Sequence, residues 1–435
     1  MNTALFWHRR DLRIDDNAAL YKALTSGYQV QPVFIFDQTI LAHLPKNDQR
    51  VLFIHQTLVS LIEEYKKYDV NLIVKFGDPK VEIPKLVQEF DVKAVFTNRD
   101  YEPSAKERDA FLFEELEKMN CEFFGAKDQV IFEKSEVTKD DGKPYAVFTP
   151  YMRKWKEKLT YFYLKSYPVL NYTTAFATIH HNYQIPSLKE MGFESKQSVD
   201  FPSQNFQKSK VEKYHETRDI PSVDGTSRMS LHLRFGTVSI RTLAREAQKT
   251  NEKYFNELIW RDFYQMILSH FPDTVNHAFK KEYDKIEWER NMEHFNAWCE
   301  GKTGYPLVDA GMRELNETGH MHNRVRMVVA SFLTKHLLLD WRLGERYFAE
   351  KLLDFELASN VGGWQWAAGC GVDAAPYFRV FNPTAQQQKF DPDFKYIKKW
   401  VPEFGTSEYI QPIIEHKFAR ERVLKRYKEA LNPVV

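Results

Sequence analysis

The sequence is poor in the features that mark several classes of protein. Its 435 residues include only three cysteines, which lie far apart, so neither a disulfide framework nor a cysteine zinc site is expected. It has no apolar run of about 18 residues, and its N-terminus lacks the apolar stretch of a signal peptide. The net charge of +1 excludes a polycation, so nucleic-acid binding would need a local basic patch. We therefore expect a cytoplasmic protein that binds neither a membrane nor a metal.

Aromatic side chains, by contrast, are abundant and unevenly placed. They make up 15% of the chain, and most of the nine tryptophans lie between residues 260 and 400. With 43% hydrophobic residues, the chain can bury sizeable cores, and its length is typical of two or three domains. The uneven distribution indicates that the C-terminal part is built differently from the rest.

The first 132 residues alternate short apolar runs with segments of helical spacing. The apolar runs cover residues 3–7, 30–36, 70–76, 92–98 and 121–126. This alternation predicts βαβ units and a doubly wound parallel α/β domain over residues 1–132, with ligands at the carboxyl ends of the strands. The polar, proline-containing stretch 133–205 is predicted to connect it to a helical domain over residues 206–435.

Two short motifs suggest nucleotide loops but lack the context that each requires. Gly-Lys-Thr at residues 301–303 is without the first glycine of a P-loop. Residues 369–374 fit G-x-G-x-x-A, but they follow a helix and a tryptophan-rich turn instead of a strand, and Pro376 stops the helix that should follow. His320 and His322 are too close together to serve as two ligands on one helix face, so a zinc site is not expected.

The segment DGTSRMS at residues 224–230 can hold an anion. It offers three hydroxyls, an arginine and several backbone amides ahead of a helical stretch, a combination suited to a diphosphate. An ordinary helix N-cap uses the same residue types, and on this segment alone it is the plainer interpretation.

A predicted helix over residues 255–268 carries an unusual stripe. Four residues of different chemistry fall on one face at i, i+3, i+4 and i+7, namely Glu257, Trp260, Arg261 and Tyr264. Core stripes are usually apolar throughout, so this mixture predicts the wall of an aromatic, polar pocket. On a later helix Asn323, Arg326 and Met327 also share a face, and Asp354 can pair with Arg326.

Longer stretches carry a family resemblance that spans nearly the whole chain. They are FWHRRDLRIDDNAAL, GTSRMS, NELIWRDFY, EGKTGYPLVDAGMRELNETGHMHNRVRMVVASFLTKHLLLDWRLGERYF and NVGGWQWAAGCGVDAAPYFRVFNPTAQQQKFD. In these residues the chain resembles the photolyase/cryptochrome family, and most of all the class I DNA photolyases that repair cyclobutane pyrimidine dimers. The resemblance implies a helical FAD-binding domain, UV-damaged DNA as the partner of a monomer, and repair by an electron from photoexcited, reduced FAD.

The resemblance also implies roles for individual residues. The positions that match FAD contacts are Tyr214, Thr226, Ser227, Arg228, Met229, Ser230, Arg326, Asp354, Glu356 and Asn360, the last of which would face flavin N5. The positions that match contacts to the flipped-out dimer are Glu257, Trp260, Asn323, Met327 and Trp366. The positions that match DNA contacts around the mouth of the pocket are Arg218, Arg261, Arg324, Arg379 and Gln386.

Three tryptophans match the electron-transfer triad of the family. They are Trp288, Trp341 and Trp364, although three buried core tryptophans would be the plainer interpretation of any such trio taken alone. Gly362 and Gly363 are expected to let the backbone pass close to the flavin ring.

The chain departs from the family pattern in three respects, one of which is that Tyr254 and His320 stand where a close relative type carries Trp. Ser104 and Ala105 stand where folate-binding members carry an Asn-Glu pair, which leaves the identity and presence of a second, antenna chromophore open. Glu356 replaces a common FAD-contacting Asp, so the charge is kept and the side chain is longer.

Two other functions are possible within the resemblance. A cryptochrome would be a blue-light receptor without repair activity, and such proteins often carry C-terminal tails. This chain ends in a plain helical stretch soon after its last strong motif and keeps the dimer-contact positions, and both facts favour repair. A (6-4) photolyase would carry two histidines where this chain has Asn323 and Met327.

Overall fold

The structure of the chain, a computed structural model, describes residues 2–179, 181, 183–194 and 199–431. Its contacts divide the chain into two compact units. Unit 1 comprises Met1–Glu133, Lys158–Phe206 and Arg228–Gln248, and unit 2 comprises Lys134–Glu157, Gln207–Ser227 and Lys249–Val435. The stretch predicted as a connector is thus shared between the units, and residues 228–248, predicted with the helical domain, pack in unit 1.

Unit 1 contains a parallel β-sheet of five strands. They are β1 (Thr3–His8), β2 (Gln29–Asp37), β3 (Ile73–Gly77), β4 (Val92–Asn98) and β5 (Glu122–Ala126). The strand order is β3-β2-β1-β4-β5, so the chain winds outward from β1 and then crosses to the other edge. All five predicted strands and the doubly wound arrangement are confirmed, because strands buried on both faces appear in the sequence as continuous apolar runs.

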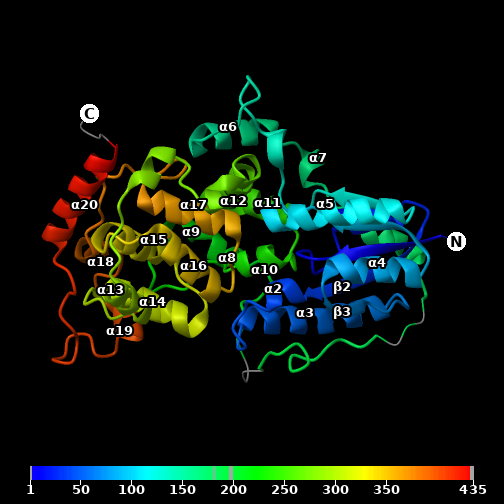
Figure 1. Ribbon diagram of the computed structural model, residues 1–435, viewed down its shortest axis with the longest axis horizontal. Helices are drawn as coiled ribbons and strands as arrows, with labels where there is room; N and C mark the ends of the chain where they lie inside the picture. Colours follow the sequence, from blue (N-terminus) through cyan, green and yellow to red (C-terminus); the bar gives the residue numbers. More distant parts are fainter. Residues whose placement is uncertain (1, 180, 182, 195–198, 432–435) are drawn as a thin grey trace. The chain divides into compact units, whose positions relative to one another are not determined.

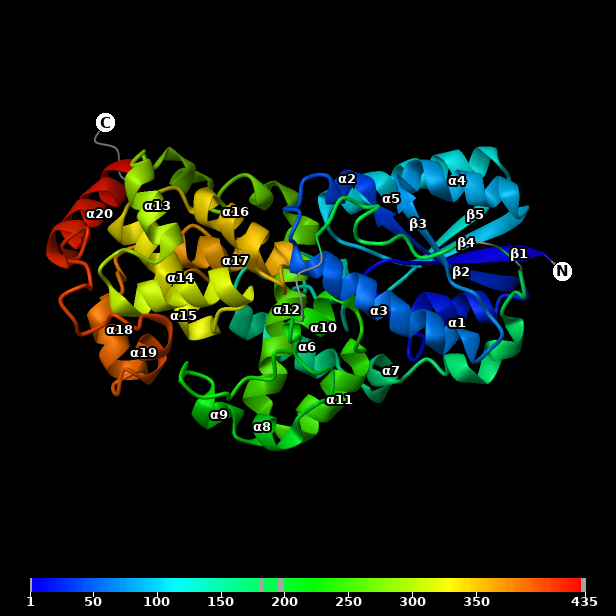
Figure 2. The ribbon, with the colours of Figure 1, turned by 90° about the horizontal axis from the view of Figure 1, so that it is seen from below.

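Helices cover both faces of this sheet. Figure 2 shows α1 and α3 on one face and α4 and α5 on the other. The helices of unit 1 are α1 (Ala18–Leu24), α2 (Gln38–Leu41), α3 (Gln49–Lys66), α4 (Pro79–Glu89), α5 (Pro103–Lys118), α7 (Tyr161–Leu164), α10 (Ser230–Phe235) and most of α11 (Ile240–Thr250). Asp37 and Asp78 follow strands directly, and each accepts a backbone N–H of the helix that it starts.

A buried network of ion pairs joins the C-terminal segment of unit 1 to its N-terminal segment. Arg241 on α11 donates to Asp16 at 2.8 Å and to Asp128 at 2.7 Å, and Arg13 donates to Asp128 at 2.7 Å. Both carboxylates are 1% exposed. Each charge is matched by several hydrogen bonds, which is the condition under which buried charges are tolerated.

Unit 2 is helical (Figure 1), and residues between 278 and 427 form a large hydrophobic core within it. Its elements are α6 (Phe148–Lys158, all but its last residue), α8 (Lys208–Glu212), α9 (Tyr214–Thr217), α12 (Glu252–His270), α13 (Met292–Glu300), α14 (Pro306–Thr318), α15 (Asn323–Ser331), a π-helix (Phe332–His336), α16 (Trp341–Lys351), α17 (Leu357–Ala368), α18 (Pro383–Phe390), α19 (Lys395–Trp400) and α20 (His416–Leu431). Helices α12, α16 and α17 lie side by side, with α17 between the other two.

The tryptophan-rich segment differs from its predicted form. Trp364 and Trp366 lie within α17 and not in a turn, and the helix ends at Gly369, whose φ of 88° only glycine adopts readily. The prediction of a turn was wrong because Gly362-Gly363 looks like a helix breaker in the sequence, whereas tertiary packing keeps both glycines helical.

Candidate functional site

The stripe on α12 forms one side of a cluster of charged pairs in unit 2. Arg218 donates to Glu257 at 2.6 Å. Asp219, which follows Arg218 in the sequence, accepts from Arg324 at 2.8 Å. Arg324 also lies 3.6 Å from the sulfur of Met327. Burial raises the pKa of Glu257, although the Arg218 partner opposes that change. The structure therefore brings together two predicted dimer contacts and two predicted DNA contacts.

The indole of Trp260 is held by a partner that the sequence did not indicate. The ring of Phe148 on α6 stacks on it, with ring centroids 3.6 Å apart and planes 7° apart. Tyr264, one turn along α12, packs at 5.5 Å with its ring tilted by 30°. Phe148 is 112 residues away in the sequence, so helical periodicity could not have found it.

Arg261 was predicted to lie around the mouth of the pocket, but the structure does not place it at an exposed rim. It is 9% exposed, and its guanidinium donates at 2.7 Å to Glu356, which is 6% exposed. The family match placed Arg261 at the mouth of the pocket, and nothing in the sequence indicated that Glu356 would cover it. The longer side chain of Glu356 reaches across to α12 and engages this arginine.

Asn360 on α17 has its side-chain amide oriented by Glu345 on α16. Its Nδ2 donates to the backbone carbonyl of Glu345 at 3.0 Å and to the carboxylate Oε1 at 2.9 Å. Both hydrogens of the amide are thereby used within the described chain. Oδ1 remains to accept a hydrogen bond from a ligand, so the amide presents an acceptor. Glu345 had not been predicted, because nothing in the sequence marks a residue 15 positions earlier as its partner.

The two glycines beside Asn360 have different surroundings. A Cβ on Gly362 would lie 2.3 Å from the ring of Tyr264, so this glycine lets α12 and α17 approach each other and does not face a ligand. The expectation for Gly362 was therefore wrong. A Cβ on Gly363 would meet nothing within 4 Å. Gly363 shares the face of Asn360, one turn along, where α17 has an open surface.

The predicted pair of Arg326 and Asp354 is present. The Nη2 of Arg326 lies 3.1 Å from both carboxylate oxygens of Asp354, and its Nε donates to the carbonyl of Met321 at 2.8 Å. The side chain of Asp354 is 10% exposed. The pair is half-buried and oriented by several hydrogen bonds, which suits a site that binds a polar ring.

The predicted phosphate segment lies where the two units of the chain meet in sequence. In unit 2, Ser227 and Tyr254 share a hydrogen bond of 2.9 Å between their hydroxyls, and Tyr214 packs edge-on against Tyr254. Thr226 is partly buried beside them in sequence. Arg228, Met229 and Ser230 belong to unit 1, and Arg228 adopts a φ of 53°, a left-handed conformation that is strained for arginine.

The remaining predicted contacts come from several elements of unit 2. Phe381 lies 6.5 Å from the Trp366 ring, and the Arg379 guanidinium lies 5.6 Å from the Phe381 ring. Asn323 is exposed at the start of α15, and Gln386 is partly buried on α18. No described contact joins Trp260 to Trp366, so the structure does not show the two predicted stacking residues meeting.

Trp364 and Trp366 point in different directions although they are two residues apart. That spacing turns a side chain by about 200° around a helix. Trp364 is 2% exposed and packs in the core of unit 2, whereas Trp366 is partly exposed. Residues this close in sequence can therefore serve separate purposes.

The three predicted electron-transfer tryptophans share one aromatic core. Trp341 and Trp364 are buried in it, and Trp288 packs against its edge. The Trp364 ring lies over Gly344, where a Cβ would meet it at 2.1 Å, three residues after Trp341 on α16. Trp298, which had not been predicted, stands edge-on to Trp364 with ring centroids 6.0 Å apart.

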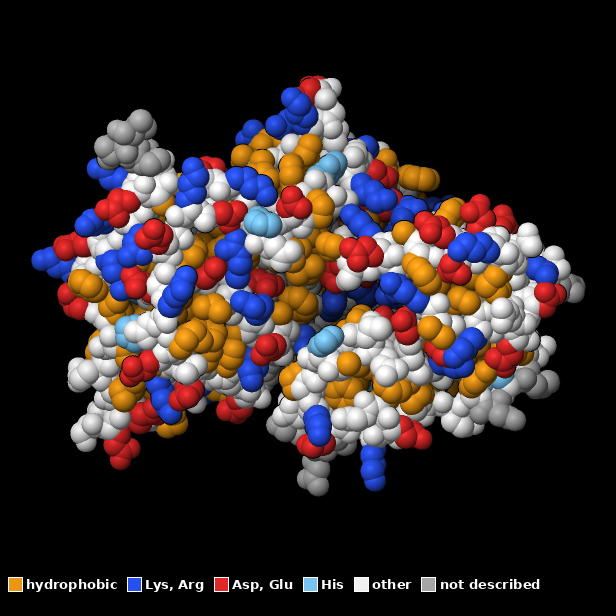
Figure 3. All heavy atoms as spheres, in the orientation of Figure 1, with side chains coloured by type: hydrophobic (Ala, Val, Ile, Leu, Met, Phe, Trp, Pro, Cys, Tyr) orange, Lys and Arg blue, Asp and Glu red, His pale blue; other side chains and the backbone are white. Residues whose placement is uncertain are grey.

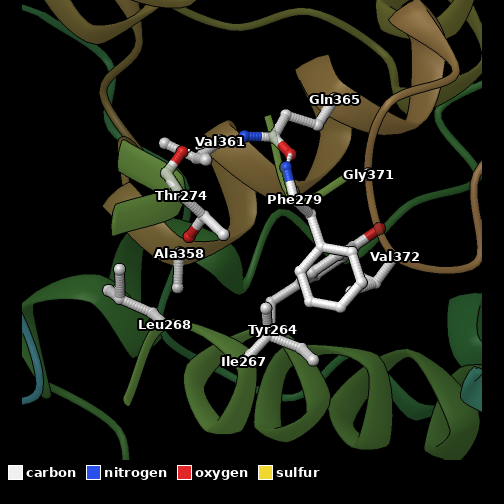
Figure 4. A pocket seen from close by; sticks show the side chains of 11 residues that line it. Tyr264, Ile267, Leu268, Thr274, Phe279, Ala358, Val361, Gln365, Gly371 and Val372 are labelled. Atoms are coloured by element: carbon white, nitrogen blue, oxygen red, sulfur yellow. Dashed lines mark hydrogen bonds between the residues drawn. The ribbon is translucent and has the colours of Figure 1, made fainter. Parts of the chain in front are cut away.

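A separate apolar pocket lies between α12 and α17. It is small, and Figure 4 shows Tyr264 and Ile267 of α12 on one side of it and Ala358 and Val361 of α17 on another. The α17 residues that line it are on the helix face opposite Asn360 and Gly363. This pocket is therefore distinct from the predicted site.

Within the described residues, several other kinds of site are not found. No group of three or more metal-ligating side chains is present there, and none of the helices has the length and apolar character needed to cross a membrane. Burial raises the pKa of Cys121 to about 11 and that of Cys370 to about 12, so these thiols stay protonated and unreactive. On the face seen in Figure 3, Lys and Arg are interspersed with Asp and Glu over the helical unit.

Comparisons with known proteins define the class. Residues 254–407 match the FAD binding domain of DNA photolyase, and residues 4–171 match the DNA photolyase domain. The chain is 37% identical to the deoxyribodipyrimidine photo-lyase of Escherichia coli, over 99% of both chains. A class III photolyase from Agrobacterium tumefaciens has a TM-score of 0.88 at 31% identity, covering 99% of this chain and 98% of that one. An archaeal photolyase from Sulfolobus tokodaii, crystallised with two FAD molecules, has a TM-score of 0.82 at 35% identity, covering 98% and 100%.

The fold and the matched domains define a flavoprotein with a parallel α/β unit and a helical FAD-binding unit. The chain belongs to the DNA photolyase family. The groups of the candidate site fit FAD: Asn360 presents an acceptor, Gly363 leaves space beside it, and Arg326 and Asp354 form an oriented polar pair.

Proposed function

We propose that this chain repairs cyclobutane pyrimidine dimers in DNA and that unit 2 holds the flavin and the dimer. The chain is a deoxyribodipyrimidine photo-lyase, as are its relatives along their full length. The observation that carries the placement is the acceptor face of α17, where Asn360 is oriented by Glu345 beside the open Gly363.

The residues around that face would hold FAD. Bound FAD, when reduced and excited by light, supplies the electron that opens the cyclobutane ring. Asn360 would accept a hydrogen bond from a protonated N5 through Oδ1, because its Nδ2 is engaged by Glu345. Arg326 and Asp354 would bind the polar edge of the ring, and the hydroxyls of Tyr214, Thr226 and Ser227 would hold the ribityl and phosphate groups.

The dimer would be held by aromatic surface and by a carboxyl group. Trp260 is kept in place from behind by Phe148, so the indole is ready to stack on a flipped-out base without first being ordered. Trp366 offers a second, partly exposed ring. Glu257, with its raised pKa, would exchange its bond from Arg218 for one to the edge of a base. Asn323 and Met327 lie at the start of α15 for further contacts.

The basic residues would bind phosphates around this pocket. Arg218, Arg324 and Arg379, with Gln386 on α18, remain in this role, whereas Arg261 is engaged by Glu356. A chain of net charge +1 with a few such residues should bind DNA with a modest salt dependence, a slope of about −0.9 in log K per phosphate contact.

The decisive experiment is a light-dependent repair assay. The FAD-loaded, reduced protein is mixed with dimer-containing oligothymidylate, and the ultraviolet absorbance of the restored thymines is followed under blue light and in the dark. Repair in the light alone is expected. Binding of damaged DNA without repair would instead support a photoreceptor of the cryptochrome type, and a folded protein that takes up no flavin would refute the placement of FAD.

A further inference from the structure

A lysine amine lies in the core of unit 2, on the π-helix Phe332–His336. Lys335 is 1% exposed, and in the described chain its Nζ donates one hydrogen bond, at 2.9 Å, to the backbone carbonyl of Arg379. A buried ammonium without a carboxylate partner is costly to the fold. π-Helical turns are themselves rare and occur often at functional sites.

The bonded carbonyl belongs to an irregular stretch between α17 and α18. The backbone bonds made by Arg379 and Val380 are local, to Pro376 at 2.9 Å and Phe378 at 3.1 Å. Lys335 joins this stretch to the helical core. The stretch carries an exposed arginine at 379 and continues into Phe381, which packs near the Trp366 ring.

We propose that Lys335 is a positioning residue for damaged DNA: its buried amine fixes the backbone at Arg379 and thereby places Arg379 on a phosphate and Phe381 against Trp366. Lys335 touches neither DNA nor flavin. The proposal rests on the function proposed above. It explains why the Lys335 amine is buried at a cost to the fold only if the stretch 376–381 binds DNA.

Because the amine of Lys335 can lose its proton, the positioning role should depend on pH. Burial, and then the nearby Arg379 guanidinium, lower the pKa of Lys335 to about 8. The other groups nearby do not titrate in that range, because the pKa of Cys370 is raised to about 12 and that of the adjacent His336 is lowered to about 3. The anchoring bond is charge-assisted below about pH 8 and weaker above it.

The test is Lys335→Met, which keeps the unbranched side chain up to the ε position and removes the charge and the donor. Affinity for a dimer-containing duplex should fall about tenfold, the loss expected for one hydrogen bond to a charged group. The melting temperature at neutral pH should stay level or rise, since a buried unpaired charge is removed. A residue needed only for folding would give a lower melting temperature. The matched control is Lys302→Met, whose side chain is 60% exposed and whose removal should change neither value.

Two further measurements separate positioning from general effects. If Lys335 acts through the stretch that carries Arg379, the loss of affinity in the double variant Lys335→Met/Arg379→Ala should be smaller than the product of the two single losses, whereas independent roles would multiply them. Affinity of the unmodified protein should fall between about pH 7 and about pH 9, and that fall should be absent in Lys335→Met. Lys335→Gln, which keeps a neutral donor, should bind with intermediate affinity, and it takes the place of the methionine variant if that protein does not fold.

The outcomes also separate this inference from the function on which it rests. If the unmodified protein does not prefer damaged DNA, the proposed function fails. If it binds and repairs dimers, and Lys335→Met binds equally well or the losses multiply, the positioning role alone is overturned.

Discussion

Glu345 is expected to set the reduction potential of bound FAD through Asn360. Nδ2 of Asn360 donates to the Glu345 carboxylate at 2.9 Å, which directs Oδ1 outward as an acceptor. An outward acceptor favours reduced flavin with a proton on N5 over oxidised flavin, whose N5 is itself an acceptor. Glu345→Leu removes the carboxylate and leaves the amide held by the backbone carbonyl of residue 345 alone, so that a rotated amide that presents its N–H becomes accessible. A hydrogen bond to a charged group is worth about 1.5–3 kcal/mol, so the one-electron potential should fall by about 60–130 mV.

The assay is a reductive titration of the FAD-loaded protein followed by flavin absorbance. Glu345→Gln is the matched control, because its side-chain oxygen still accepts from Asn360 and the potential should stay close to that of the unmodified protein. A Glu345→Leu protein that is folded, flavin-loaded and unchanged in potential would refute the reasoning, since the amide would then not depend on its partner for orientation.

Three further predictions concern the aromatic core and the acid stability of unit 1. Trp288→Phe should slow the photoreduction of oxidised FAD while leaving repair by chemically reduced protein nearly intact, and equal loss of both would contradict the electron-transfer role. Gly344→Ala places a Cβ 2.1 Å from the Trp364 ring, so thermal denaturation should show a loss of about 1–3 kcal/mol, and an unchanged melting temperature would argue against this packing. Burial alone would raise the pKa of Asp128, but two arginines lower it to about 2, below the ordinary 3.8. This depressed pKa contributes about 2 kcal/mol that is present above about pH 4 and is lost as the pH falls toward 2. Asp128→Asn should remove that part of the acid dependence, as measured by unfolding across the same pH range.

The features that were predicted correctly depend on residues close together in the sequence or on a simple rule of charge pairing. The strands of unit 1 follow from apolar runs, and the stripe of Glu257, Trp260 and Tyr264 follows from helical spacing. The Arg326–Asp354 pair follows from the rule that a charge near a core needs its opposite. The sequence could not reveal Phe148 behind Trp260, because that contact depends on how helices distant in sequence pack.

At two positions, contacts with residues of another helix made the prediction from sequence wrong. Arg261 was predicted at the mouth of the pocket because its position matches a DNA contact of the family, but Glu356 covers it. Gly362 was expected to face a cofactor, but Tyr264 occupies that side of α17. In both cases the residue type suited the expected role, and a neighbour from another helix decided the outcome.

The interleaving of the two units has a consequence for how the protein is made. The chain passes from one unit to the other between residues 133 and 134, 157 and 158, 206 and 207, 227 and 228, and 248 and 249. Asp16 and Asp128 emerge early from the ribosome, but their buried partner Arg241 follows more than 100 residues after the second of them. The nascent α/β unit can pair Asp128 with Arg13, but Asp16 is without its arginine partner while much of the chain is still being synthesised. Its fold can be completed only after part of the helical unit has already been translated.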